Sequence, residues 1–242
     1  RLDRREFLAL ASTFGASAAT AYGLLGLQAP ARAQSAEAHR GGRLRVGLRV
    51  MALDDPRRFD WPEKANVARQ FCETLVRWEP DFTFSGQLLD GWEVSDDART
   101  YTLRLRRGAT WTDGTPFTAD DVIFNIARWC DRSVEGNSMA NSMDTLIDPE
   151  TDRLAEGAVA RVDDLTVRLQ LPRPDISLIA AMSDYPALIV HRDFDEAASL
   201  AEAPVGTGPF VLEEIAVGDR AVVRRREDGG WWGGEALLDA VE

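Results

Sequence analysis

The chain has 242 residues, of which 45% are hydrophobic and 28% charged, a composition typical of a folded globular protein. It carries 28 Lys and Arg against 40 Asp and Glu, and the net charge of −12 disfavours nucleic-acid binding and a basic membrane-surface patch. Two cysteines exclude a dense disulfide scaffold and a four-cysteine zinc site, and two histidines leave little for a metal centre, so we expect no metal or cofactor.

The N-terminal 33 residues have the pattern of an export signal. Arg4 and Arg5 precede a mildly apolar stretch, 7–29, that contains no charged residue, and the segment ends in the small-x-small sequence Ala31-Arg32-Ala33. This pattern predicts a twin-arginine signal peptide over 1–33 and a periplasmic destination for the mature chain. A membrane anchor is the alternative, because about 20 apolar residues can span a bilayer.

The next elements are predicted from periodicity. Small and polar residues in 34–41 predict a flexible lead-in, and the alternation of apolar residues from Leu44 to Val50 with Arg and Gly predicts a half-buried strand. Asp and Pro residues in 52–63 predict a loop. Apolar residues recur at helical spacing after it, which predicts an amphipathic helix over about 64–77.

Further strands are predicted at 100–106 and 167–171, where apolar and polar residues alternate, and a last strand begins at Ala221. Thr118 is a predicted N-cap for a helix in which three apolar residues form one stripe: Val122, Ile126 and Trp129. Strands and helices mix without a regular βαβ repeat, and the sequence therefore predicts a mixed α/β (α+β) fold.

Candidate catalytic groups are scarce. Two adjacent aspartates occur at four places, and turn or helix-start positions account for most of them without catalysis: Asp54-Asp55, Asp96-Asp97, Asp120-Asp121 and Asp163-Asp164. Neither His39 nor His191 has ligand-like neighbours in the sequence. The segment Gly206-Thr207-Gly208-Pro209 lacks the Lys-Ser/Thr ending of a phosphate loop, which favours a structural turn. We therefore expect no enzymatic activity.

Cys72 and Cys130 leave two possibilities open. In an exported protein the two cysteines could form a disulfide, and otherwise they are two separately buried thiols.

Taken in order, several motifs resemble the extracellular solute-binding proteins of peptide- and nickel-type ABC importers, known as family 5. The motifs are Cys72-Glu73-Thr74-Leu75-Val76, 92–97, 101–106, 108–122 with Asp113-Gly114-Thr115-Pro116, 162–167, 206–210 and Trp232-Gly233-Gly234. The run Gln87-Leu88-Leu89-Asp90-Gly91 departs from the family pattern. Since each motif is short, the ordered set carries the resemblance, which covers nearly all of the mature chain.

The resemblance implies the fold of a type 2 periplasmic binding protein, in which two α/β lobes surround a cleft and an extra subdomain is inserted in the first lobe. Residues 42–72 and 190–242 would belong to the first lobe, and 73–189 to the extra subdomain. Only this incomplete first lobe and the subdomain are expected in the chain, without the second lobe.

The implied function is that of a monomeric periplasmic binding protein, which captures a peptide or peptide-like solute in the cleft and delivers it to ABC permease subunits. The alternatives are a sensor that presents its ligand to a membrane receptor, and a binder of a nickel complex, an opine or an oligosaccharide.

Three segments correspond to ligand-facing positions in relatives: 50–53, 59–63 and 133–143. From these segments we predict four ligand-binding residues: Met51, Trp61, Asn137 and Met139. Trp61 offers a large apolar face with one donor, the amide of Asn137 can donate and accept, and Met139 adapts to irregular shapes.

Overall fold

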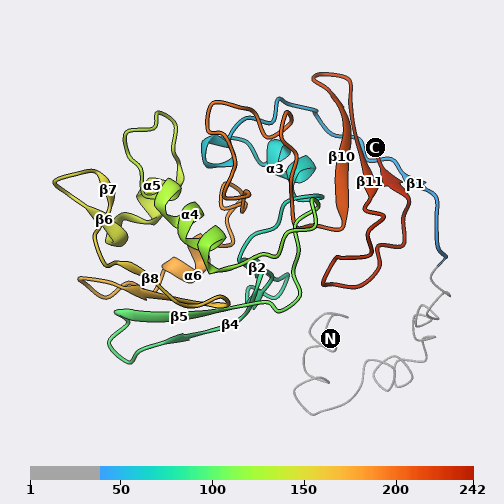
Figure 1. The fold of residues 1–242 in the computed structure, drawn as a ribbon. Coiled ribbons are helices and arrows are strands. Elements are labelled where there is room, and N and C mark those ends of the chain that lie inside the picture. The colour runs from blue at the N-terminus through green and yellow to red at the C-terminus, as the bar shows by residue number, and fades with distance from the viewer. Residues whose placement is uncertain (1–38) are drawn as a thin grey trace, which may run out of the picture. The chain divides into compact units, whose positions relative to one another are not determined.

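Two four-stranded sheets organise residues 39–242, the part of the chain that the computed structural model describes (Figure 1). The first sheet has the order β1 (Arg43–Leu44), β12 (Ala240–Val241), β11 (Arg220–Arg225) and β10 (Phe210–Ala216), in which only the β1–β12 pair is parallel. The second sheet is antiparallel throughout, in the order β4 (Leu89–Val94), β5 (Thr100–Leu105), β9 (Thr166–Gln170) and β8 (Val159–Asp163). The predicted signal peptide, 1–33, lies outside the described residues.

Shorter elements complete the fold. Two small hairpins pair β2 (Val76–Trp78) with β3 (Phe84–Gly86), and β6 (Ile147–Asp148) with β7 (Arg153–Leu154). The α-helices are α3 (Pro62–Ala68), α4 (Ala119–Trp129), α5 (Met139–Ser142) and α6 (Leu178–Ala181), and 3-10 turns occur at Pro56–Arg58 and Asp144–Leu146. Among the described helices, none has the length and apolarity needed to cross a membrane.

The helix α4 forms as its sequence predicts. The Asp121 carboxylate accepts a hydrogen bond from the backbone N–H of Thr118 at 2.8 Å, which satisfies a group that the first turn leaves unpaired. The predicted stripe of Val122, Ile126 and Trp129 is fully buried, and α4 packs on one face of the β8–β9 part of the second sheet (Figure 1).

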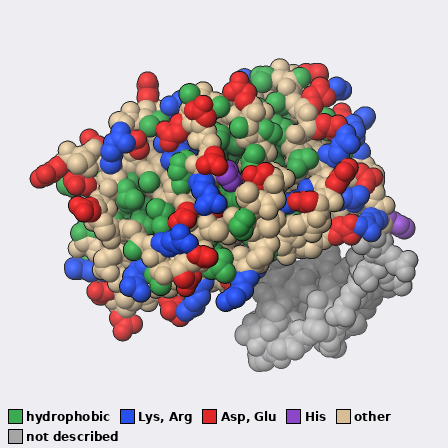
Figure 2. Space-filling view, viewed as in Figure 1, with side chains coloured by type: hydrophobic (Ala, Val, Ile, Leu, Met, Phe, Trp, Pro, Cys, Tyr) green, Lys and Arg blue, Asp and Glu red, His purple; other side chains and the backbone are tan. Residues whose placement is uncertain are grey.

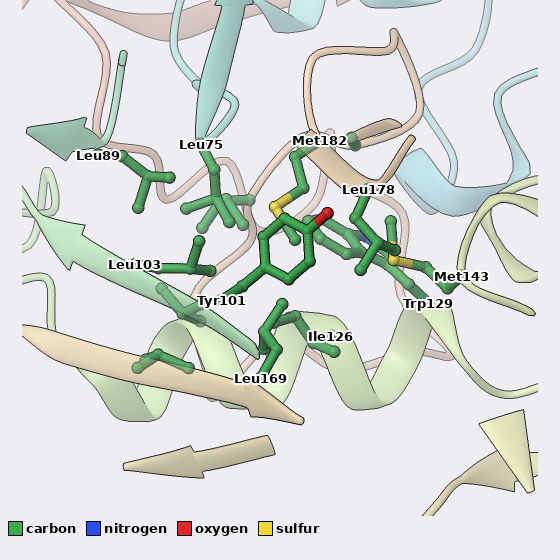
Figure 3. Close-up of a cluster of buried hydrophobic side chains, with 14 of the residues drawn as sticks. Leu75, Leu89, Tyr101, Leu103, Ile126, Trp129, Met143, Leu169, Leu178 and Met182 are labelled. Carbon is green, nitrogen blue, oxygen red and sulfur yellow. The ribbon is translucent and has the colours of Figure 1, made fainter. Parts of the chain in front are cut away.

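The buried apolar side chains fall in two clusters. One contains residues between Leu75 and Ile189, and Figure 3 shows the Tyr101 ring at its centre, with Leu75 and Leu89 to one side and Trp129 to the other. The other cluster contains residues from 53–72 and from 188–223. Residues 41–242 nevertheless form one compact unit, and the division into a first lobe and an extra subdomain stays a prediction.

The predicted helix over 64–77 is wrong in its second half. Helix α3 ends at Ala68, and Val76 already belongs to β2. The carbonyls of Gln70 and Phe71, which a continuing helix would use, accept hydrogen bonds from Phe210 N at 3.2 Å and Gly208 N at 2.9 Å. Tertiary backbone pairing therefore outcompetes the helical spacing of the apolar residues.

The predicted strand from Leu44 to Val50 is also largely wrong, because only its first residue lies in a strand, β1. Val46 N still donates to Glu242 O at 2.8 Å, but residues beyond it have no assigned strand partner in the described chain. The alternating side chains Leu44 and Val46 are each 47% exposed, so alternation alone did not produce burial.

The strands predicted at 100–106 and 167–171 and the strand beginning near Ala221 are confirmed within a residue or two as β5, β9 and β11.

Cys72 and Cys130 are both buried and unpaired, and they belong to different apolar clusters. The disulfide alternative is therefore wrong. Burial raises the pKa of Cys130 to about 12 and that of Cys72 further, so both remain thiols at neutral pH.

Candidate functional site

Four charged side chains meet where the loop before α3 reaches the C-terminal end of α4. The Asp55 carboxylate contacts Arg57 Nε at 2.8 Å and Arg128 Nη2 at 2.6 Å. The Glu196 carboxylate contacts Arg57 Nη2 at 2.8 Å and Arg128 Nε at 3.3 Å. We call these four residues the charge cluster.

The residues of the charge cluster differ sharply in exposure. The side chains of Asp55, Arg57 and Arg128 are 2%, 1% and 4% exposed, whereas that of Glu196 is 46% exposed. Two positive and two negative groups balance one another, which is the arrangement that a buried charge requires. Glu196 thus separates two buried guanidinium groups from solvent.

Local structure places each of these groups. Asp55 caps the 3-10 turn Pro56–Arg58 by accepting a hydrogen bond from Arg57 N at 3.1 Å, and Pro56 presets the backbone of that turn. Arg128 lies in the last turn of α4, with its guanidinium 5.5 Å from the ring centre of Phe124 and 5.0 Å from that of Phe194.

Glu196 comes from a loop, 191–200, that contains no helix or strand. The buried side chains of Phe194 and Leu200 anchor the loop on either side of it. Within the loop, Asp195 accepts a hydrogen bond from Ala197 N at 2.9 Å.

The electrostatics of the two arginines follow from burial and pairing. Burial acts to lower the pKa of Arg57, but pairing with the Glu196 and Asp55 carboxylates outweighs burial and raises the pKa. For Arg128 burial prevails and lowers the pKa, although Asp55 opposes it. Both groups remain cations, since guanidinium does not lose its proton in proteins.

The four predicted ligand-binding residues lie in different surroundings, some exposed and some buried. Trp61 lies at the N-cap of α3 and is 55% exposed, and Met51 is half-buried. Met139 is 1% exposed within the larger apolar cluster. Asn137 Nδ2 donates to the carbonyls of Arg128, Trp129 and Asp131 at 3.2, 3.1 and 2.8 Å, which caps the C-terminal end of α4.

Two of the predicted segments adjoin the charge cluster. Ser138, in the segment 133–143, donates to the Arg57 carbonyl from both its backbone N (2.9 Å) and its Oγ (3.1 Å). Leu53, in the segment 50–53, accepts a hydrogen bond from Ala201 N at 3.4 Å, next to the loop that carries Glu196. Contact of any of the four residues with a ligand stays a prediction.

Sequence reasoning did not select the arginines or Glu196. A signal for Arg128 was present, because Asp121, Asn125 and Arg128 repeat at helical spacing and interrupt the buried face of α4. Asn125 satisfies the neighbouring backbone, since its Nδ2 donates to Val190 O at 2.7 Å and its Oδ1 accepts from Val190 N at 3.1 Å. Nothing local identified Glu196, which lies 68 positions from Arg128.

A second buried carboxylate, Glu73, joins two of the sequence motifs. It is 1% exposed and accepts hydrogen bonds from the indole N–H groups of Trp231 at 3.2 Å and Trp232 at 3.0 Å. The Arg106 guanidinium lies 3.9 Å from the ring centre of Trp232. Burial raises the pKa of Glu73, while these hydrogen bonds oppose the increase. The geometry is that of a structural clamp between distant segments.

The Asp113-Gly114-Thr115-Pro116 motif is a tight turn, as the sequence predicts. Asp113 Oδ1 accepts from Thr115 N at 2.8 Å and from Thr115 Oγ1 at 2.7 Å, and Gly114 has a φ of +89°. His191 packs edge-on against Trp111 with ring centres 5.0 Å apart and lies 3.3 Å from Thr115 Oγ1. In the described residues no cluster of His, Cys, Asp or Glu could hold a metal ion.

An open groove of about 520 Å³ lies between the segment 45–50, α3 and β11, and no residue of the charge cluster lines it. Val50 is the part of the predicted ligand-facing segments that reaches it. Figure 2 shows acidic and basic side chains interspersed on the face in view. Recognition on this face would therefore depend on particular groups more than on a broad field of one sign.

Comparison with known proteins decides the family. Residues 83–242 match the family described as "Bacterial extracellular solute-binding proteins, family 5 Middle". The chain belongs to this family. The resemblance drawn from the sequence motifs is therefore confirmed, and family members are solute-binding proteins of transport systems.

This family 5 chain resembles curated relatives over part of their length. It is 28% identical over 189 residues to the probable ABC transporter periplasmic-binding protein SapA of Escherichia coli K12, covering 72% of the chain and 34% of SapA. It is 29% identical over 167 residues to the dipeptide-binding protein of the same organism, covering 64% and 31%. The chain thus spans about a third of the length of these relatives.

Solved structures show the same fold. The binding protein AgaA of A. tumefaciens R10, in complex with agropinic acid, has a TM-score of 0.68 and 26% identity, with 83% of this chain and 39% of AgaA covered. Haemophilus influenzae OppA, in complex with RPPGFSPFR, has a TM-score of 0.71 and 22% identity, with 84% and 41% covered. The mixed α/β structure of residues 41–242 is therefore part of a type 2 periplasmic binding protein fold, as the motifs predict.

Proposed function

We propose that the chain is part of the solute-binding component of an ABC importer, which captures a peptide or peptide-like solute in the periplasm and delivers it to permease subunits. The family match over 83–242 is the observation that carries this proposal. Names of relatives support the substrate class, since they include a dipeptide-binding protein and the glutathione-binding protein GsiB.

In this proposal residues 42–72 and 190–242 form the first lobe, residues 73–189 form the extra subdomain, and the cleft-facing segments are 50–53, 59–63 and 133–143. The protein acts as a monomer without enzymatic activity and reaches the periplasm by the twin-arginine route. A ligand-presenting sensor for a membrane receptor is the alternative role of the same scaffold.

An opine is the second candidate solute, and one observation favours it. The solved structure of AgaA, which is 26% identical to this chain, contains agropinic acid. Nickel complexes and oligosaccharides are further solute classes to include in a screen.

A ligand screen on the full-length protein tests the proposal. Thermal unfolding is measured with di- and tripeptides, glutathione, an opine, a nickel chelate and an oligosaccharide. A solute at 100 times its dissociation constant stabilises the folded protein by about 2.7 kcal/mol, and a stabilisation of this size gives a measurable shift in melting temperature. The largest shift should come from a peptide-like solute, and a protein that responds to none of these classes would contradict the proposal.

An uptake assay separates the importer from the sensor. Cells that lack the protein should lose uptake of the labelled solute and regain it when the protein and its permease are present together. Normal uptake without the protein, accompanied by loss of a transcriptional response to the solute, would favour the sensor.

A further inference from the structure

Glu196 is the exposed member of an otherwise buried charge cluster. Its two carboxylate oxygens face different arginines, Oε2 to Arg57 Nη2 at 2.8 Å and Oε1 to Arg128 Nε at 3.3 Å. The Arg128 Nε contact is a hydrogen bond, whereas the Arg57 Nη2 contact is an ion pair that leaves this buried nitrogen without a hydrogen-bond partner. The two arginines therefore form a receptor for one carboxylate, and Glu196 occupies it.

The charge balance of the cluster depends on that carboxylate. Asp55 contacts both arginines from within the fold and neutralises one positive charge. Without Glu196 the cluster would hold one uncompensated positive charge, on guanidinium groups that are 1% and 4% exposed. A buried charge that loses its partner strongly destabilises a protein. Any group that replaces Glu196 must therefore be an anion.

The surroundings of the receptor suit a small organic anion. The rings of Phe124 and Phe194 lie against the Arg128 guanidinium and supply apolar contact area beside the charge. Ser138 holds the Arg57 carbonyl and Asn137 holds the Arg128 carbonyl, so the backbone of both arginines is fixed before any ligand arrives. Such preorganisation lowers the entropic cost of binding.

Glu196 itself is attached in a way that permits exchange. Its neighbours Asp195 and Ala197 are exposed, and the loop that carries it has no helix or strand. A side chain on a short tether competes with an external ligand at an effective concentration on the order of millimolar. A solute carboxylate that binds with additional contacts elsewhere can overcome that competition.

We propose that Arg57 and Arg128 bind a carboxylate of the transported solute, and that Glu196 occupies their site while solute is absent. This inference rests on the proposed function, and it narrows the solute to an anion with a free carboxylate, such as a peptide C-terminus or an opine acid. Glu196 leaves the arginines when the solute carboxylate arrives.

The site itself is tested without knowledge of the solute. In the full-length protein, Glu196→Ala should lower the melting temperature, and excess formate or acetate should restore part of the loss. Neither chloride at the same ionic strength nor formamide should restore the melting temperature. Glu202→Ala is the matched control, because the Glu202 carboxylate accepts a hydrogen bond from Ser199 N at 2.8 Å in the neighbouring turn. Formate should leave that variant unchanged.

The role in recognition is tested with the solute that the screen identifies and with its carboxamide. The wild-type protein should bind the acid at least about 10-fold more tightly than the amide, a difference of about 1.4 kcal/mol. Glu196→Ala should bind the acid more tightly than the wild-type protein does, and it should bind the amide with the same affinity as the wild-type protein. If Glu196→Ala does not fold, Glu196→Gln retains the side-chain volume and serves instead.

The outcomes distinguish this inference from the proposed function. Formate rescue together with preference for the acid supports the receptor. A lack of rescue, or equal affinity for acid and amide, overturns it even if a peptide or other solute binds. A wild-type protein that binds no solute of any class would instead contradict the importer proposal, and with it the transport role of the receptor.

Discussion

Gly206 lies so close to a neighbouring backbone that any side chain there should destabilise the fold. A Cβ atom built on Gly206 would lie 1.8 Å from Phe71 O and 2.6 Å from Phe71 C. Non-bonded carbon and oxygen atoms do not approach so closely, and the obstructing atoms are backbone, which cannot rotate away. Gly206→Ala must therefore separate the turn 206–209 from the segment after α3.

The magnitude follows from what this separation disturbs. The Gly208 N–Phe71 O hydrogen bond (2.9 Å) and the Phe210 N–Gln70 O hydrogen bond (3.2 Å) join the same two segments. Overpacking a well-packed site costs about 1–3 kcal/mol, and each hydrogen bond lost adds about 1 kcal/mol. We therefore expect Gly206→Ala to lower the free energy of unfolding by about 3–5 kcal/mol.

Denaturant unfolding of the full-length protein, followed by tryptophan fluorescence and circular dichroism, measures this change. Gly47→Ala is the matched control, because a Cβ at Gly47 meets no atom within 4 Å and its φ is not positive. The control should change stability by less than about 0.5 kcal/mol. If the free energy of unfolding of Gly206→Ala lies within about 1 kcal/mol of the wild-type value, the close approach to Phe71 does not explain why this position is glycine.

Four further predictions concern other parts of the chain. The pKa of Glu73 in the folded protein is raised above its ordinary value of 4.5, so the wild-type protein loses stability as pH rises from the unfolded-state pKa through the folded-state pKa. The stability of Glu73→Gln relative to wild type should therefore be greater at pH 7 than at pH 4. A difference in urea midpoints that does not change between these pH values would contradict this. Gly114→Val should cost about 1 kcal/mol or more, since φ is +89°, while solute affinity measured by calorimetry stays unchanged; lost binding at an unchanged melting temperature would assign the turn to the ligand site. Asn137→Ala should destabilise by about 1–3 kcal/mol through the uncapped end of α4, and a change in solute affinity without this loss would instead support ligand contact. Replacing Arg4 and Arg5 with Lys should leave precursor in the cytoplasm on cell fractionation, and a normal periplasmic yield would refute the twin-arginine route.

Several features of this protein could be predicted from the sequence because neighbouring residues decide them. The capping pair of Thr118 and Asp121 and the apolar stripe that follows specify α4 within one stretch of chain. The turn at Gly114 needs only a short polar side chain before a residue that adopts positive φ. The order of such motifs along the chain was sufficient to indicate the family, because each is a local solution to folding.

Other features required the tertiary structure, because distant segments decide them. The apolar spacing of 64–77 satisfies a helix equally well, yet carbonyls of Gln70 and Phe71 pair with 208–210 and end the helix early. Asn137 is predicted from the sequence as a ligand-binding amide, and only the folded chain shows that its Nδ2 also donates to carbonyls at the end of α4.

The charge cluster is the clearest case. Arg57, Arg128 and Glu196 come from a 3-10 turn, a helix end and an irregular loop, and no periodicity connects these three positions. An isolated buried arginine is unfavourable, so each member of the cluster depends on partners that only the folded chain brings within hydrogen-bond distance. The apolar stripe of α4 indicates its buried face from the sequence, whereas only the folded chain brings Glu196 to the two arginines.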